Sequence, residues 1–446
     1  MKYLYFPVAI ILLISVNLGC GPAKVTPKLT SADITKVINQ MMVGMLHDVT
    51  NPPLAARFFS YTCISGYEVL SKSDSKLQGL ESVLNNYPKI RNPSVTGFDP
   101  RLSAVFAMIA TASKLQPSGP AMKVFEQKLI DSCLNAGFSR GKIDSSLKYG
   151  QQISAQIMAY AKSDGYNKIS NYKRYTLTGT PGSWDPTPPA YIAAVEPYFS
   201  TVRPLTLKAS GQFVPAPPVP FSTDKGSAFY KYLLQCHSFD ADSLSTDQRT
   251  IAAFWDCNPF AVQDNGHMQI GLKKISPGAH WMGITGIACK KAGASFERSM
   301  EVNTMVAISL MDGFIACWNE KYKTNRIRPE TAIHQYMDPR WHSFLQTPPF
   351  PEYLSGHSFI SSAAAGILTS FFGDNFTYTD DVEVAFGIPP RKFSSFNKAA
   401  EEAGYSRLLG GIHFQDGITN GKKQGELVGA WVLGKFNHNS KPPGAQ

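Results

Sequence analysis

The chain has 446 residues, of which 43% are hydrophobic and 17% charged, a balance that excludes an intrinsically disordered protein and predicts a packed globular one. At this length it holds two or three domains, or one large helical domain. The formal net charge of +10 favours anionic partners, but no run of five Lys or Arg residues occurs, so we expect no nucleic-acid binding.

The first 20 residues have the pattern of a signal peptide. Lys2 gives a positive start, residues 4–16 form a mostly apolar stretch, and Asn17-Leu18-Gly19-Cys20 is a small-residue processing site. Its end resembles a bacterial lipobox, although Asn17 departs from that pattern. Cys20 is therefore a candidate lipidation site, with cleavage without lipidation and an uncleaved anchor as alternatives. We expect a bacterial cell-envelope lipoprotein, held at the membrane by its lipid anchor only, or a periplasmic or secreted protein.

The rest of the chain predicts an all-α protein in three parts. Residues 21–175 form an N-terminal helical region, because apolar residues recur at three- and four-residue spacing between Ser31 and Lys168. Prolines between residues 176 and 221 forbid a long helix, so this part is expected to be an extended crossing segment. Residues 222–446 form a C-terminal helical domain. Five aromatic residues should attach the crossing segment to the fold: Trp184, Tyr191, Tyr198, Phe199 and Phe213.

Four helices are expected in the second half. The one at 296–318 carries apolar residues on two stripes and should be buried nearly all round. The others are expected at 359–372, at 398–409 and within 421–436. No stretch beyond the leader reaches 18 consecutive apolar residues. Six cysteines remain after Cys20, an even number in a compartment where disulfides can persist, and no Cys-x-x-Cys pair supports a structural zinc site.

The first candidate site follows the helix at 296–318. Lys321 lies just beyond it, and Arg328-Pro329 comes seven residues later. If the turn stays helical, this spacing is about two turns, or ~10.5 Å, and both cations share one face. Pro329, however, disfavours helical geometry at Arg328 and predicts a bend there. Two cations in this position either bind an anion or interact with the negative end of the helix dipole.

A second candidate site is Ser355-Gly356-His357, directly before an apolar helix. The start of a helix offers free backbone N–H groups, which suit an oxyanion when a hydroxyl and an imidazole lie beside them. The alternative is that Ser355 or Ser358 is an ordinary N-cap and that His357 is a surface histidine.

A third candidate site runs from Ser406-Arg407 through Gly410-Gly411 to His413 and Asp416. The arginine ends one helix, the two glycines allow a tight turn, and the histidine opens the next element with an acid three places on. Alone, this is an ordinary junction between two helices. Three such clusters within one hundred residues point to one shared site.

Together the clusters resemble the signature of the vanadium-dependent haloperoxidase and type 2 phosphatidic acid phosphatase superfamily. That signature reads Lys, six residues, Arg-Pro; then Pro-Ser-Gly-His; then Ser-Arg, five residues, His, three residues, Asp. Two positions differ here, since Leu354 replaces the proline and Asp416 comes one residue early. The sequence at 316–322 and 348–353 is similar to the soluble bacterial haloperoxidase-related branch, and the resemblance is strong over 250–435.

The resemblance implies a helical bundle with an anion site in its core. Lys321, Arg328 and Arg407 would neutralise the oxygens of a bound phosphate or vanadate, with arginine favoured for its planar fork of donors. Ser355 and the backbone N–H of Gly356 would complete the site for the oxyanion.

The same resemblance assigns the catalytic residues. His413 would bond to the vanadium of vanadate, or would attack phosphorus to form a phosphohistidine. His357 would be the general acid/base. Asp416 would accept the second N–H of His413 and so fix its tautomer.

The favoured function is a vanadate-dependent haloperoxidase, in which vanadium activates hydrogen peroxide as a Lewis acid and a halide is oxidised. One alternative is a phosphatase of the acid-phosphatase type, which hydrolyses phosphate esters without a cofactor. Another is a noncatalytic oxyanion-binding lipoprotein. Oligomeric state stays open. His267 and His280 are candidate pocket-lining residues, whereas His47, His237 and His438 have no supporting context. Trp255 and Trp281 are expected in the core or in the pocket wall.

Overall fold

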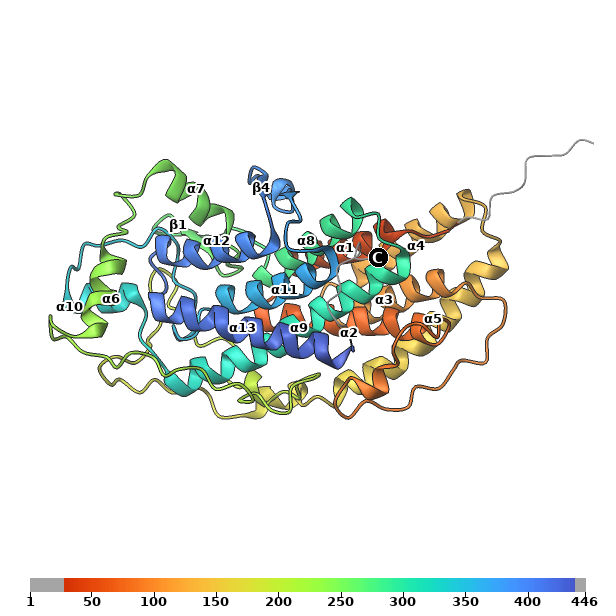
Figure 1. The fold of residues 1–446 in the computed structure, drawn as a ribbon, viewed down its shortest axis with the longest axis horizontal. Coiled ribbons are helices and arrows are strands. Elements are labelled where there is room, and N and C mark those ends of the chain that lie inside the picture. The colour runs from red at the N-terminus through yellow and green to blue at the C-terminus, as the bar shows by residue number, and fades with distance from the viewer. Residues whose placement is uncertain (1–27, 438–446) are drawn as a thin grey trace, which may run out of the picture.

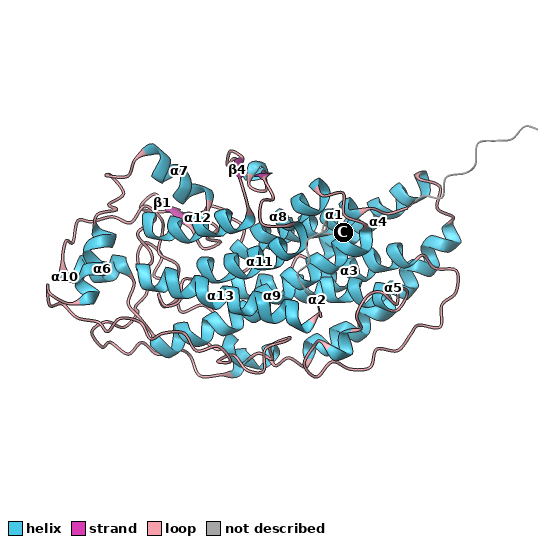
Figure 2. Cartoon of the chain, in the orientation of Figure 1, coloured by secondary structure: helices cyan, strands magenta, loops and turns pink. Residues whose placement is uncertain are grey.

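The structure is a computed structural model that describes residues 28–437. The predicted signal peptide, Cys20 and His438 lie outside these residues. Within the described part, thirteen α-helices account for nearly all regular structure, and two short hairpins are the only sheets. Figure 2 shows a molecule dominated by helices, which confirms the predicted all-α class.

The first five helices form one end of the elongated bundle (Figure 1). Helices α2, α3 and α5 pack against one another, and α2 also packs along α9 of the second half. The helical prediction was too broad between α2 and α3, where a long loop contains a single 3-10 turn, Leu80–Ser82. The bounds are α1 Ser31–His47, α2 Pro52–Ser71, α3 Pro100–Leu115, α4 Pro120–Asn135 and α5 Arg140–Lys162, followed by the 3-10 helix Tyr166–Asn171.

The crossing segment at residues 176–221 is extended, apart from the short 3-10 helix Phe199–Thr201. Trp184 and Phe199 are fully buried, as predicted, whereas Tyr191 is 64% exposed. A buried carboxylate fixes the segment to the central helix: Asp312 accepts hydrogen bonds from three successive backbone N–H groups, at residues 205–207, over 2.6–3.1 Å. The segment is therefore a packed part of the fold.

Helix α9, Phe296–Thr324, is the centre of the bundle. It contacts α1, α2, α8, α11 and α13, which explains why its apolar residues cover more than one face. Among the described residues it is the one helix long and apolar enough to cross a membrane by composition, but 94% of that window is buried inside the fold. Its apolarity is thus used in core packing, as predicted for the segment at 296–318.

The remaining helices surround α9. Helices α11, α12 and α13 form a tight group beside it, and α6, α7 and α10 lie towards the opposite end from α5 (Figure 1). The bounds are α6 Ala228–His237, α7 Thr246–Phe254, α8 Pro277–Lys291, α10 Pro329–Tyr336, α11 Gly356–Phe372, α12 Phe396–Leu409 and α13 Gln415–Lys435. The antiparallel hairpins pair β1 Val262–Asp264 with β2 Gln269–Gly271, and β3 Tyr378–Asp380 with β4 Arg391–Phe393, while Val384–Phe386 is a 3-10 turn.

Close contact between α11 and α13 depends on glycine. A Cβ atom at Gly425 of α13 would lie 2.0 Å from the backbone oxygen of Phe359 in α11, so only glycine allows the two backbones to approach this closely. Because α11 begins with Gly356-His357, this contact also positions the second candidate site.

The six cysteines of the described part are all buried and free. The even number of cysteines noted in the sequence therefore does not correspond to disulfide pairs. The main hydrophobic cluster contains side chains from Leu29 to Phe436, so both halves of the chain contribute to one continuous core. The division of the chain into parts at residues 21–175, 176–221 and 222–446 stays a prediction from the sequence.

Candidate active site

The three candidate clusters meet at one end of α9. Lys321 comes from its last turn, Gly356 and His357 open α11, Arg407 lies in the last turn of α12, and His413 lies two residues before α13. A small cavity lies between them, and its wall includes the last four of these residues. Much of the remaining wall is aromatic: Phe260, Phe314, Trp318 and Phe350.

Lys321 is fully buried and fixes the loop that leads into α11. Its Nζ donates to the backbone oxygens of Pro351, Glu352 and Leu354 at 2.9, 3.0 and 2.6 Å. Burial, together with the nearby Arg328, lowers the pKa of Lys321 to about 7. Its charge therefore lies behind the cavity wall, while its N–H groups hold the loop in place.

Arg328 lies beyond the end of α9, where Asn325 adopts a left-handed conformation with φ of 47° and ends the helix. The two cations therefore do not share one helix face. The predicted bend at Pro329 is confirmed, because Arg328 is the extended N-cap of α10, with φ −83° and ψ 152°. Its Nε donates to the Phe350 oxygen at 2.9 Å and its Nη1 to the Ile412 oxygen at 2.8 Å.

One donor of Arg328 has no partner. Its Nη2 is buried without a hydrogen bond to any described residue, and burial lowers the pKa of the guanidinium to about 10. A buried donor left unpaired costs about 1–3 kcal/mol, more when it is charged. An anion beside Arg328 would satisfy this donor and offset the cost.

Ser355 is the N-cap of α11, since its Oγ accepts from the backbone N–H of Ser358 at 3.3 Å. The hydroxyl of Ser358 also donates to the same atom at 2.9 Å. The N-cap alternative is thus correct for Ser355, and Gly356 beside it lines the cavity. The start of α11 is therefore both capped by Ser355 and exposed to the cavity at Gly356.

His357 presents an unpartnered nitrogen at the cavity. Its Nε2 is buried and has no hydrogen-bond partner among the described residues, while the Trp255 backbone bonds to the ring. Burial and the positive charge of Arg407 hold the pKa of His357 well below 6.5. The imidazole is therefore neutral. The alternative that His357 is a surface histidine is wrong, because Nε2 is buried.

Arg407 reaches the cavity from the last turn of α12. Its Nε donates to the hydroxyl of Ser406 at 2.9 Å, and its Nη2 donates to the backbone oxygen of Trp255. The guanidinium is almost completely buried, and burial lowers its pKa. Trp255 thus orders both Arg407 and His357 through its backbone, while its indole packs in the core.

His413 is held between an acid and a cation. Its Nδ1 lies 2.8 Å from Oε1 of Glu352, and its Nε2 lies 3.1 Å from Nη1 of Arg328. Because the carboxylate accepts and the guanidinium donates, the ring carries its proton on Nδ1 and has a lone pair on Nε2. Burial and Arg328 keep the pKa of His413 well below 6.5, so the ring is neutral.

The prediction that Asp416 orients His413 is wrong. Oδ1 of Asp416 accepts from Nη1 of Arg326 at 2.7 Å, and Oδ2 accepts from the backbone N–H of Val219 at 3.0 Å. Asp416 therefore ties the start of α13 to the crossing segment. Glu352 takes the predicted role, and it was missed because it lies 61 residues from His413 in the sequence.

Arg326 is a second residue that sequence reasoning missed. Its Nη1 lies between Asp416, at 2.7 Å, and Oε2 of Glu352, at 3.3 Å, and the guanidinium lies over the Phe414 ring. Its Nε and Nη2 have no partner among the described residues. Arg326 thus neutralises the acid that holds His413.

The remaining candidates from the sequence, His267, His280, Trp255 and Trp281, do not line the cavity. His280 is buried behind Cys257, which does line the cavity, and His267 is exposed on the turn between β1 and β2. Trp281 donates from its indole to Ser361 at 2.8 Å in the core. The pocket wall uses Trp318 instead.

Comparisons with known proteins identify relatives of this chain. The family model for the VCPO second helical-bundle domain matches residues 301–441. A solved structure of a bacterial vanadium-dependent iodoperoxidase is similar to 92% of this chain and 97% of its own, with 37% sequence identity and a TM-score of 0.85. No curated protein matches.

More distant structures share the fold. A holo-type bacterial vanadium-dependent chloroperoxidase has a TM-score of 0.65 and 15% identity over 87% of this chain and 94% of its own. The apo-type form has a TM-score of 0.63 and 14% identity over 88% and 96%. These similarities therefore extend over most of the chain.

Proposed function

This chain belongs to the vanadium-dependent haloperoxidase family, and we propose that it oxidises a halide, iodide in the first place, with hydrogen peroxide at a vanadate held by His413. Iodide is the most easily oxidised of the common halides, and the structure with 37% identity is that of an iodoperoxidase. The observation that carries the proposal is the tautomer of His413, whose Nε2 carries the lone pair, next to Nη1 of Arg328, while Glu352 holds the proton on Nδ1.

The residues present fit a vanadate. Metal-ligating histidines almost always donate their second N–H to a carboxylate or carbonyl, as His413 does to Glu352. The unpaired Nη2 of Arg328, beside His413, offers a charged donor to an oxygen of the anion, and Arg407 contributes a guanidinium from the cavity wall. When bound, vanadate would supply Lewis-acid activation of peroxide.

Two further groups would strengthen anion binding. Gly356 lies at the cavity wall at the N-terminus of α11, where free N–H groups and the helix dipole favour negative charge. Lys321 would contribute positive charge from behind the wall while its N–H groups keep the loop at residues 351–354 in place. Ser355 caps the helix and so fixes the direction of those N–H groups.

His357 would act as the general base. Its Nε2 has no partner and its ring is neutral, so it can accept a proton from hydrogen peroxide as the peroxide binds. The aromatic wall around it, which includes Trp318 and Phe350, excludes bulk water from the same space. A poorly hydrated cavity with Arg407 in its wall, and with Arg328 next to His413, favours a large, weakly hydrated anion such as iodide.

The location of the protein is also proposed from its sequence. The pattern at residues 17–20 supports an envelope lipoprotein held by a lipid on Cys20, with the catalytic body outside the cytoplasm. Metabolic labelling with a palmitate analogue tests this, since labelling should be lost in Cys20→Ser.

One assay tests the proposed activity against its alternatives. Purified protein loaded with vanadate should oxidise iodide in the presence of peroxide, and bromide and chloride are measured in parallel. Phosphate-ester hydrolysis without vanadate, combined with no halide oxidation, would establish the phosphatase alternative instead. Oxyanion binding with neither activity would establish the noncatalytic alternative.

A further inference from the structure

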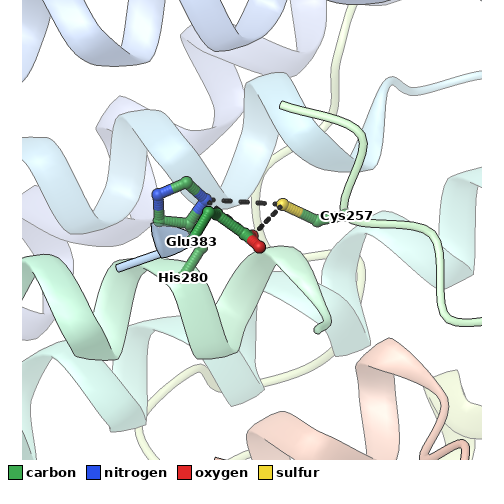
Figure 3. A group of neighbouring side chains, drawn as sticks. All are labelled: Cys257, His280 and Glu383. Carbon is green, nitrogen blue, oxygen red and sulfur yellow. Dashed lines mark hydrogen bonds and ion pairs between the residues drawn. The ribbon is translucent and has the colours of Figure 1, made fainter. Parts of the chain in front are cut away.

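Three potential metal ligands lie together beside the cavity, outside the residues used above. Cys257 comes from the loop after α7, His280 from α8, and Glu383 from the loop after β3. Figure 3 shows the three side chains pointing toward one another from these separate segments. All three are buried, with exposures of 2%, 0% and 6%.

We propose that Cys257, His280 and Glu383 form a binding site for a divalent transition metal ion of the zinc type. The three ligand atoms form a nearly equilateral triangle. The thiol sulfur lies 3.4 Å from Nδ1 of His280 and 3.6 Å from Oε1 of Glu383, and these last two atoms lie 3.5 Å apart.

These distances fit tetrahedral coordination. With metal–sulfur bonds of about 2.3 Å and metal–nitrogen or metal–oxygen bonds of about 2.0 Å, tetrahedral ligands lie about 3.5 Å apart when one is sulfur and about 3.3 Å apart otherwise. Each edge of the triangle is within about 0.2 Å of the expected value. The three ligand atoms are therefore already spaced for one ion, whose fourth position is left for water.

The surroundings support the ligand His280. Its Nε2 lies 2.9 Å from Oδ2 of Asp380, which is the carboxylate partner that metal-ligating histidines usually have on their second nitrogen. The ring also stacks on Trp255, with 4.9 Å between centroids and an interplanar angle of 27°. The direction of Nδ1 toward Cys257 and Glu383 is thus fixed from two sides.

The site lies between two cavities. Glu383 lines a second, small cavity together with Asp256 and Lys274, and Cys257 lines the anion cavity. In the metal-free protein, hydrogen bonds link the three groups, with protons on the thiol and on the imidazole. The metal ion replaces these protons, so binding releases them to solvent, and the charge of the ion is balanced by thiolate and carboxylate.

The sequence did not show this site. Cys257 is 23 residues from His280 and 126 residues from Glu383, so no short motif connects them. The absence of a Cys-x-x-Cys pair gave a structural zinc site little support, but that argument considers only ligands close together in the sequence. A site assembled from three distant segments leaves no such signal.

Cobalt(II) is the probe for this site, because it binds zinc sites and its thiolate complexes absorb in the near ultraviolet. Titration of chelator-treated, vanadate-free protein with Co²⁺ should give one equivalent with a thiolate-to-cobalt band and tetrahedral d–d absorption. Cys257→Ser should lose the charge-transfer band. Cys289→Ser, which removes another buried thiol from α8, should keep it.

A second variant keeps the proposal testable if Cys257→Ser does not fold, as judged by far-ultraviolet circular dichroism. Glu383→Gln should weaken Co²⁺ binding by roughly tenfold or more, since an amide is a poorer ligand than a carboxylate. The proposal is overturned if the wild-type protein gives no stoichiometric thiolate band. It is equally overturned if the band persists unchanged in Cys257→Ser, or if Glu383→Gln binds Co²⁺ as tightly as the wild type.

Discussion

Glu352 and His413 are 61 residues apart in the sequence, and their side chains lie 2.8 Å apart in the core. The acid is fully buried and also contacts Arg326 at 3.3 Å. This pair decides which nitrogen of His413 carries the proton. Nε2 is the atom proposed to bind vanadium. Glu352 therefore affects vanadate binding through the tautomer of His413, without contacting the vanadate itself.

Glu352→Gln is therefore expected to weaken vanadate binding by roughly 10- to 100-fold, the usual cost of removing a partner of a metal-ligating histidine. The amide is similar in size but can present an N–H to Nδ1, which disfavours the required tautomer. Equilibrium dialysis with vanadate measures the effect. Asp416→Asn is the matched control, because Asp416 contacts Arg326 and Val219 instead of His413, and it should change vanadate affinity much less. Equal affinity of Glu352→Gln and wild type would contradict the role of Glu352.

His413→Ala should bind no vanadate at concentrations that saturate the wild-type protein and should show no halide oxidation. The reason is that His413 has a carboxylate partner on its second nitrogen, whereas the other neutral histidine of the cavity wall, His357, bonds to the Trp255 backbone instead. Thermal unfolding of the variant controls for loss of the fold. Full activity in a folded His413→Ala protein would refute the proposed ligand.

His357→Ala is expected to separate turnover from cofactor binding. General acid–base groups typically contribute roughly 10²- to 10⁴-fold, so kcat/KM for peroxide should fall in this range while vanadate affinity changes little. His237→Ala, at a partly exposed histidine next to Asp338, is the control and should behave as wild type. If peroxide kinetics survive the loss of His357 unchanged, another group accepts the proton.

Sequence reasoning found the elements that carry local signals. Pro329 predicted the bend at Arg328, and the apolar stripes of 296–318 predicted a helix buried on all sides, because these properties depend on neighbours in the chain. It assigned the partner of His413 to Asp416, which is nearby in sequence. The true partner, Glu352, lies in an apolar loop whose position depends on Lys321 and on tertiary packing, so no local pattern could identify it.

The pKa of Lys321 predicts a pH dependence of stability. In the folded protein this pKa is about 7, below its ordinary value of 10.5, because burial disfavours the charged form. Between these two values the unfolded chain binds a proton that the folded chain does not. Stability should therefore rise with pH above about 7, by up to about 1.4 kcal/mol per pH unit from this group.

Lys321→Met tests this dependence in vanadate-free protein, by chemical denaturation at several values between pH 7 and pH 9. The variant removes the titrating group and keeps most of the apolar stem, although it also loses three hydrogen bonds to the loop at residues 351–354. Its unfolding free energy should rise less steeply with pH than that of the wild type. Parallel curves would mean that other groups cause the dependence.

Gly425→Ala is expected to destabilise the fold and disturb the site together. The added Cβ would lie 2.0 Å from the backbone oxygen of Phe359, so α13 must move away from α11, at a cost of roughly 1–3 kcal/mol or more. Because α11 starts at Gly356, the same displacement should also lower vanadate affinity. Gly434→Ala adds the same methyl group to α13 where no atom lies within 4 Å, and it should be neutral or slightly stabilising. Chemical denaturation measures the free energy of unfolding of both variants, and equilibrium dialysis measures their vanadate affinity. Equal vanadate affinity in the two variants would show that the contact between α11 and α13 does not position the anion site.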